Sequence, residues 1–190
     1  MLAAVPIKPF GVAKRRLSPV LDDAARSRLG KAIAANTLAV AGSVIDDVAV
    51  VTADPGVADW ARAQGVAVIG DPGTGLDGAA TAALGAAGGR WAIIHADLPM
   101  LSSSDVAALV EAVPESGVVL APSADGGTNA IAGAVAAFAF SYGPGSFARH
   151  LAAAAALPHA IVSRPGLALD LDTPHDLDRA RTLAGTAWLG

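Results

Sequence analysis

The sequence predicts a single α/β domain whose mostly parallel, doubly wound sheet is flanked by helices. Short apolar, β-branched runs recur along the chain, and alanine-rich amphipathic stretches separate them. Strands that alternate with helices in this way form a parallel sheet that lies between two layers of helices. No linker-like change in composition and no internal repeat divides residues 1–190, so one domain is expected. The later strands have less helix between them, which predicts a mixed sheet there.

The expected strands are short apolar segments bounded by glycine, proline or polar residues. In chain order they are Leu2–Ile7, Val48–Thr52, Val66–Ile69, Trp91–His95, Val118–Ala121, Asn129–Gly133, Ala160–Ser163 and Leu167–Leu171. The helices are amphipathic, and Asp22 and Thr173-Pro174 are start signals for the first and the last of them. In chain order they are Asp22–Ala41, Gly56–Gln64, Asp77–Ala87, Ser103–Val113, Ser146–Leu157 and Pro174–Leu183.

The composition excludes several classes of protein. A chain of 190 residues buries roughly 70% of its unfolded surface, which is enough for a core. No apolar run approaches the roughly 18 residues of a membrane-spanning helix. The net charge is −4 without a basic block, and there is no cysteine to form disulfides or thiolate metal sites. The start also lacks a secretion signal, so we expect a cytoplasmic protein with neither a membrane nor a nucleic-acid partner.

Basic residues follow the first expected strand. Pro6-Ile7-Lys8-Pro9 leaves that strand, and Lys14-Arg15-Arg16-Leu17 follows in an expected loop. Flexible cations at the carboxyl end of a strand suit a polyphosphate, because they neutralise charge that builds on a leaving group. Taken alone, the stretch is more typical of a solvated basic turn. No Walker A pattern is present, so the chain is not a P-loop protein.

Residues 73–78 match the pattern G-x-G-x-x-G, and Asp97 lies near the position of a ribose-binding acid in a dinucleotide fold. The match is weak in a chain with 21 glycines, and three residues separate it from the preceding strand. What the segment does predict is a glycine-rich turn, which lets backbone amides approach a ligand closely.

Polar segments also follow later strands. His95-Ala96-Asp97-Leu98-Pro99 places a carboxylate where metal or phosphate chemistry occurs in such sheets, although a loop cap explains Asp97 equally well. Residues 123–129 and 143–147 form two glycine-rich loops. The second loop precedes a helix, and free amides at a helix N-terminus bind phosphate. For Ser146 the simpler interpretation is an ordinary N-cap, and for Asp125-Gly126-Gly127 it is a turn.

Asp170 and Asp172 alternate with leucines in Leu167–Asp172. On a strand, both carboxylates project from one face and lie roughly 6.6 Å apart. At an effective dielectric of about 20 they repel by roughly 2.5 kcal/mol. A magnesium ion shared with Asp97 turns this repulsion into attraction, whereas water screens the pair on an exposed edge. The leucines favour burial, and hence the metal.

Read together, these segments resemble the guanylyltransferases of coenzyme F-420 biosynthesis, which activate 2-phospho-L-lactate or phosphoenolpyruvate. The resemblance covers nearly the whole chain. It rests on residues 5–9, 14–17, 95–99, 122–129, 143–147 and 167–174. It implies a nucleotidyltransferase fold of the kind found in sugar-nucleotide and molybdenum-cofactor transferases, with GTP as co-substrate.

The resemblance also implies roles for particular residues. Magnesium would be held by Asp97, Asp170 and Asp172, which with Lys8 form the catalytic set. The phosphate of the acceptor would be held by Thr128, Gly143 and Ser146. The nucleotide would be bound by Lys8, Lys14, Arg16, Gly75, Leu76 and Asp77. Asp77 stands where the family is expected to have asparagine near the base, which weakens the expected preference for guanine.

Several alternatives compete with this interpretation. A transferase of the same fold could act on a sugar phosphate or molybdopterin, and a non-catalytic nucleotide sensor is also open. A dinucleotide-dependent oxidoreductase leaves the Asp170/Asp172 pair unexplained. Asp170-Leu171-Asp172-Thr173 also imitates the D-x-D-x-T motif of haloacid dehalogenase-type phosphatases. Those enzymes need the motif on the first strand, whereas here the aspartates lie on the last expected strand, so this class is rejected. The expected partners are GTP, a phospho-acid, a downstream transferase that takes up a labile product, and a second copy in a homodimer.

Overall fold

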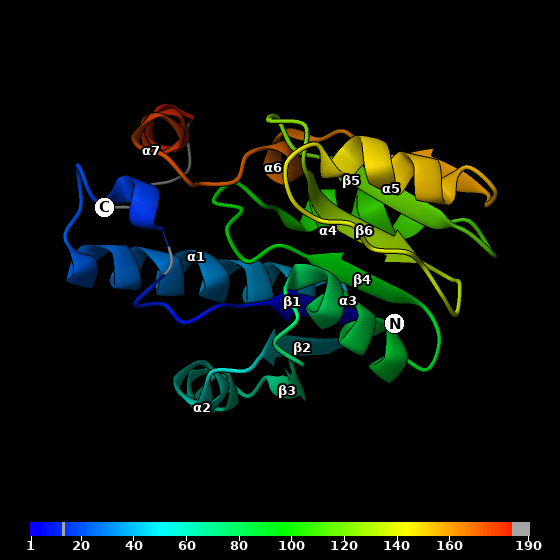
Figure 1. Cartoon of the computed structure of the whole chain (residues 1–190), viewed down its shortest axis with the longest axis horizontal. Helices are drawn as coiled ribbons and strands as arrows, with labels where there is room; N and C mark the ends of the chain where they lie inside the picture. Colours follow the sequence, from blue (N-terminus) through cyan, green and yellow to red (C-terminus); the bar gives the residue numbers. More distant parts are fainter. Residues whose placement is uncertain (13, 184–190) are drawn as a thin grey trace.

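A computed structural model describes residues 1–12 and 14–183. Its centre is a seven-stranded sheet with the order β3-β2-β1-β4-β6-β5-β7 (Figure 1). The strands are β1 (Leu2–Pro6), β2 (Asp47–Thr52), β3 (Ala67–Gly70), β4 (Trp91–Ile94), β5 (Val118–Pro122), β6 (Thr128–Gly133) and β7 (His159–Ile161). All neighbours pair in parallel except β6, which is antiparallel to both β4 and β5. The expectation of a mixed second half is confirmed.

Helices connect most of these strands. They are η1 (Arg15–Leu17), α1 (Asp23–Gly42), α2 (Pro55–Ala63), α3 (Leu76–Ala86), α4 (Ser103–Glu111), α5 (Ser146–Ala154), α6 (Pro165–Ala168) and α7 (Pro174–Thr182). The expected start signals are confirmed, because the side chain of Asp22 caps α1 and Thr173 forms a capping box with Asp176 at α7. No helix in the described ranges is long and apolar enough to cross a bilayer.

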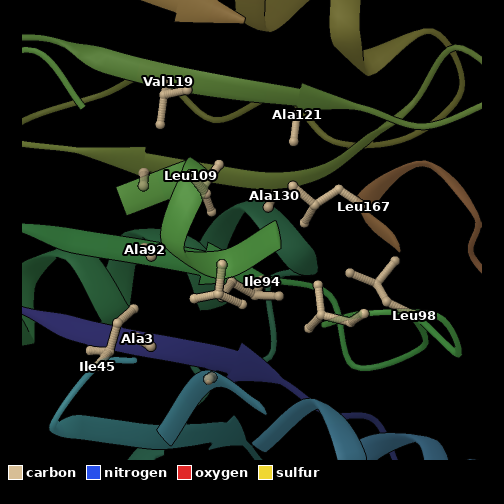
Figure 2. Packing of buried hydrophobic residues seen from close by; sticks show 14 of the residues in the cluster. Ala3, Ile45, Ala92, Ile94, Leu98, Leu109, Val119, Ala121, Ala130 and Leu167 are labelled. Carbon is tan, nitrogen blue, oxygen red and sulfur yellow. The ribbon is translucent and has the colours of Figure 1, made fainter. Parts of the chain in front are cut away.

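The helices cover both faces of the sheet. On one face α1 and α2 pack against β1 and β2, and α4 packs against β4, β5 and β6. On the other face α3 and α5 pack through alanines. Figure 2 shows Leu109 of α4 and Leu167 of α6 over Ala92, Ile94 and Ala130 of the sheet. The small side chains let helix and sheet approach closely, as the composition suggested.

The expected strand Leu167–Leu171 is wrong. Pro165 begins the short helix α6, and the chain then continues outside the sheet. A β-carbon on Gly166 would collide with the carboxylate of Asp105 and the carbonyl of Met100, so this turn packs tightly against the start of α4. Beyond α6, the amide of Leu171 donates to the carbonyl of Asp97 at 3.0 Å. The alternation of buried leucines and cavity-lining aspartates nevertheless persists without a ladder.

A separate apolar cluster holds the segment that follows α6. Leu169 and Leu171 pack there with Leu17 of η1, Ile33 of α1 and Leu177 of α7. Leu17 and Leu171 are completely buried. Burial of a leucine contributes roughly 2 kcal/mol, so the cluster ties the basic loop after β1 to the aspartate segment. Residues close to these leucines are thereby brought to the same end of the sheet.

Candidate active site

A cavity of about 670 Å³ opens at the edge of the sheet where β1 and β4 end. Thr128 and Asn129 reach the same edge because β6 runs antiparallel to β4, which puts the amino end of β6 beside the carboxyl end of β4. The expected site residues all line this cavity except Arg16 and Asp77. Ligands of open α/β sheets bind at this edge, so the cavity is the candidate active site.

Lys14 lies between two of the expected metal-binding carboxylates. Its Nζ is 2.6 Å from Oδ2 of Asp97 and 3.0 Å from Oδ1 of Asp172. The Lys14 side chain is only 7% exposed, whereas that of Asp172 is 45% exposed. The Lys14 backbone has φ of 60°, in the left-handed region that costs a non-glycine residue roughly 1–2 kcal/mol. Strain of this kind persists where other contacts hold it, and here the two ion pairs do so.

The electrostatics follow from this arrangement. Burial works against charge on Lys14 and Asp97, but their mutual attraction prevails, so the pKa of Lys14 is raised and that of Asp97 is lowered. Both groups are therefore charged at neutral pH. Asp170 is different: burial and the charge of Asp97 raise its pKa, although the amide of Asn129 donates to it at 3.3 Å. Three carboxylates thus line the site, and Lys14 pairs with only two of them.

In residues 1–12 and 14–183, no three His, Cys, Asp or Glu side chains are arranged to hold a metal ion. The ammonium of Lys14 bridges two of the expected ligands instead. Oδ1 of Asp97, however, is buried and has no hydrogen-bond partner within the described part of the chain. An orphaned carboxylate oxygen beside two further carboxylates is a donor set that suits Mg²⁺, provided that Lys14 moves.

The loop of residues 141–145 closes another side of the cavity. Arg149 of α5 donates to the carbonyls of Ser141, Tyr142 and Pro144 at 2.8–3.2 Å. The amide of Tyr142 donates to Oδ1 of Asp77 at 2.6 Å, which ties the loop to α3. Asp77, expected near a nucleotide base, therefore also has a structural contact.

The ring of Tyr142 packs against two histidines beside the cavity. It lies 5.3 Å from that of His95 and 4.8 Å from that of His150, measured between centroids. Oη of Tyr142 and Nε2 of His95 are both buried without a partner in the described ranges, and both residues line the cavity. Together with Oδ1 of Asp97, they are polar atoms that a bound ligand could satisfy.

The buried hydroxyls beside the loop contact a histidine that the sequence reasoning missed. Oγ1 of Thr128 is 3.0 Å from Nδ1 of His150, and Oγ of Ser146 donates to the same oxygen at 3.3 Å. All three residues are almost fully buried. His150 follows Ser146 by four positions on α5, so a search for polar residues on the buried face of that helix would have found it.

The remaining expected residues are more exposed. Lys8 lines the cavity with its side chain in solvent, and Arg16 lies on η1, where its charge reaches Asp125. Gly73, Gly75 and Leu76 line the cavity at the start of α3. Gly75 has φ of 89°, which explains a glycine at the N-cap.

Residues 1–182 match the family model described as "Guanylyl transferase CofC like". The chain belongs to this family. It is 36% identical to a phosphoenolpyruvate guanylyltransferase of Rubrobacter xylanophilus, with 99% of this chain and 97% of that protein covered. It is 30% identical to a 2-phospho-L-lactate guanylyltransferase of Methanothermobacter thermautotrophicus, with 92% and 81% covered.

The fold of this CofC-like chain also occurs in more distant solved structures. A nucleotidyl transferase from Methanothermobacter thermautotrophicus has a TM-score of 0.67 at 17% identity, with 95% of each chain covered. A CMP-2-keto-3-deoxy-manno-octonic acid synthetase complexed with CTP has a TM-score of 0.62 at 16% identity, with 96% and 97% covered. The expected nucleotidyltransferase fold and family are therefore confirmed.

Proposed function

We propose that the protein transfers GMP from GTP to the phosphate of a three-carbon phospho-acid and releases pyrophosphate, as a step in coenzyme F-420 biosynthesis. The acceptor would be phosphoenolpyruvate or 2-phospho-L-lactate, the compounds named in its relatives. One observation supports this most directly. The cavity holds both the ion-paired cluster of Lys14, Asp97 and Asp172 and the buried hydroxyls of Thr128 and Ser146.

The chemistry needs no nucleophilic side chain. A phosphate monoester is largely dianionic at neutral pH, since its second pKa is about 6. One of its oxygens attacks the α-phosphorus of GTP, and the bond from that phosphorus to the bridging oxygen of pyrophosphate breaks. The protein must align two anions and neutralise the leaving group. Lys8, Lys14 and Arg16 supply cations for the second task.

The acceptor phosphate would bind at Thr128, Gly143 and Ser146. Ser146 begins α5, so the dipole of that helix favours an anion there, although the amides of Ser146 and Phe147 already donate to the carbonyls of Gly143 and Gly126. Gly143 has φ of 109°, which lets its backbone approach a ligand in a conformation closed to other residues. The loop that contains Gly143 is held by Arg149, so these donors are in place before a ligand arrives.

Asp97, Asp170 and Asp172 would hold Mg²⁺ together with the phosphates of GTP. Bound there, Mg²⁺ would offset the negative charge of the triphosphate and of the carboxylates. Two observations support this assignment: Oδ1 of Asp97 has no hydrogen-bond partner among the described residues, and the charge of Asp97 raises the pKa of Asp170 in addition to burial. Asp97 and Asp172 already attract Lys14, which is consistent with a cation bound between these two carboxylates.

Purified protein incubated with Mg²⁺ and each nucleoside triphosphate tests the proposal when pyrophosphate is followed with each candidate acid. We expect release with GTP and a three-carbon phospho-acid. Release only with a sugar phosphate or molybdopterin would indicate a same-fold transferase of another pathway. Binding of GTP without pyrophosphate release from any acceptor would indicate a sensor.

A further inference from the structure

We propose that His150 is a positioning residue that fixes the direction of the Thr128 hydroxyl, so that this hydroxyl donates its proton to an anionic oxygen of the acceptor. The identity of that acceptor rests on the proposed function. The direction of the hydroxyl does not, because it follows from contacts within the chain.

A backbone amide determines which ring nitrogen of His150 carries the proton. The amide of Ser141 donates to Nε2 of His150 at 2.8 Å. A backbone N–H only donates, so Nε2 must be unprotonated and a neutral ring carries its hydrogen on Nδ1. Burial lowers the pKa of His150 to about 4, so the ring is neutral at physiological pH. Nδ1 therefore donates to Oγ1 of Thr128, 3.0 Å away.

The Thr128 hydroxyl has one remaining interaction to make, the donation of its own proton. Its oxygen accepts from Nδ1 of His150 and from the hydroxyl of Ser146, and these two bonds use both lone pairs. Within the described part of the chain, no other group accepts the proton of this hydroxyl. Thr128 lines the cavity, so that proton is available to a ligand there. A ligand oxygen that itself carries a proton would compete poorly, whereas a phosphate dianion or carboxylate accepts readily.

The histidine is held in place on several sides. It has no exposed surface, and the ring of Tyr142 meets it edge-on at 4.8 Å. Arg149 donates from Nε to Oγ of Ser141 at 2.8 Å, which steadies the segment whose amide reaches Nε2. A rotation of the ring would break both hydrogen bonds at once. The tautomer and the Thr128 hydroxyl are thus preorganised before any ligand binds.

Nitrogen NMR of the free full-length protein tests the inference without any activity. The signals of His150 are assigned by comparison with His150→Asn. We expect a neutral ring protonated at Nδ1 in the pH range from about 6 to 8. A ring protonated at Nε2 overturns the proposal, whether or not the enzyme turns over.

Two substitutions then separate positioning from simple packing. Asparagine can place an amide donor near the position of Nδ1, whereas glutamine can place an acceptor near Nε2 but offers Thr128 no donor. We expect His150→Gln to raise KM for phosphoenolpyruvate by about tenfold or more, with KM for GTP within about twofold of wild type. His150→Asn should retain KM for phosphoenolpyruvate within about threefold. Equal effects of the two variants, or equal changes in both KM values, contradict positioning.

Thr128→Val, which lacks the hydroxyl, provides the background for a double-mutant test of His150→Gln. If His150 acts through the Thr128 hydroxyl, then His150→Gln adds no further increase in KM once that hydroxyl is gone. A full additional increase overturns the proposal. An inactive wild type with every acid would refute the proposed function only, because the NMR result still decides the tautomer. The same result decides the matter if His150→Gln fails to fold.

Discussion

Nζ of Lys14 lies 2.6 Å from Oδ2 of Asp97, although 83 positions separate the two residues. The same nitrogen reaches Asp172, 158 positions away. These two contacts explain how Asp97 and Asp172 can share one cavity in the free protein. Under the proposed function, Lys14 occupies the place between Asp97 and Asp172 that a divalent cation would take.

Lys14→Met tests whether a divalent metal ion can take the place of the lysine ammonium between Asp97 and Asp172. The variant leaves Asp97 and Asp172 unpaired, and we expect it to lose about 1–3 kcal/mol of unfolding free energy, since the site is partly open to water. Adding MgCl₂ without nucleotide should raise its melting temperature more than that of wild type. Lys31→Met, which removes an exposed lysine from α1, is the control and should respond like wild type. An equal response from all three proteins would contradict a shared cation site.

Asp172→Asn tests the catalytic role. We expect turnover to fall by about 100-fold or more, because the neutral amide cannot balance a cation in the site. The fold should survive, since Asp172 is 45% exposed, so the melting temperature should change by only a few degrees. Pyrophosphate release is the measurement, and Asp178→Asn on the exposed face of α7 is the control. Unchanged turnover in Asp172→Asn would exclude a metal role for this carboxylate.

Tyr142→Phe removes a buried hydroxyl that has no partner among the described residues. Because an unsatisfied buried hydroxyl costs roughly 1–3 kcal/mol, we expect the free energy of unfolding to stay constant or to increase. Chemical denaturation measures it. If the hydroxyl binds a ligand, the same variant should show a higher KM for that ligand. A clear loss of stability would mean that the hydroxyl has a partner after all.

Stability should depend on pH through His150. Burial lowers its folded pKa to about 4 from an ordinary 6.5, so the unfolded chain binds this proton more tightly. The resulting stabilisation is complete above about pH 6.5 and is lost as the pH falls toward 4, by ~3 kcal/mol in total. Asp77 opposes the lowering of the His150 pKa, whereas Arg149 and His95 support it.

Denaturation of wild type and His150→Asn at pH 7, 5.5 and 4.5 measures this effect. The decline in unfolding free energy should be smaller in the variant, which has no ring to protonate. His95, whose pKa is also lowered, contributes with the same sign in both proteins, and Asp170, whose pKa is raised, contributes with the opposite sign. Parallel curves would show that His150 does not titrate in this range.

Much of the architecture was predictable because its signals are local. Apolar runs, breakers and caps act over a few residues, so the strands from β1 to β7 and the starts of α1 and α7 were expected near their observed positions. The expected strand Leu167–Leu171 was wrong for the same reason. Its alternation is real, but the pairing of a strand depends on a neighbour that the sequence does not identify.

The sequence by itself determined the fold class, the family and the set of polar segments that line the cavity. Only the tertiary structure decided which polar atoms meet. Lys14 reaches Asp97 and Asp172 because buried leucines far apart in the chain share one cluster. Thr128 meets His150 because an antiparallel strand brings its amino end to the start of α5. Contacts of this kind depend on packing in three dimensions, whereas motifs depend on neighbours along the chain.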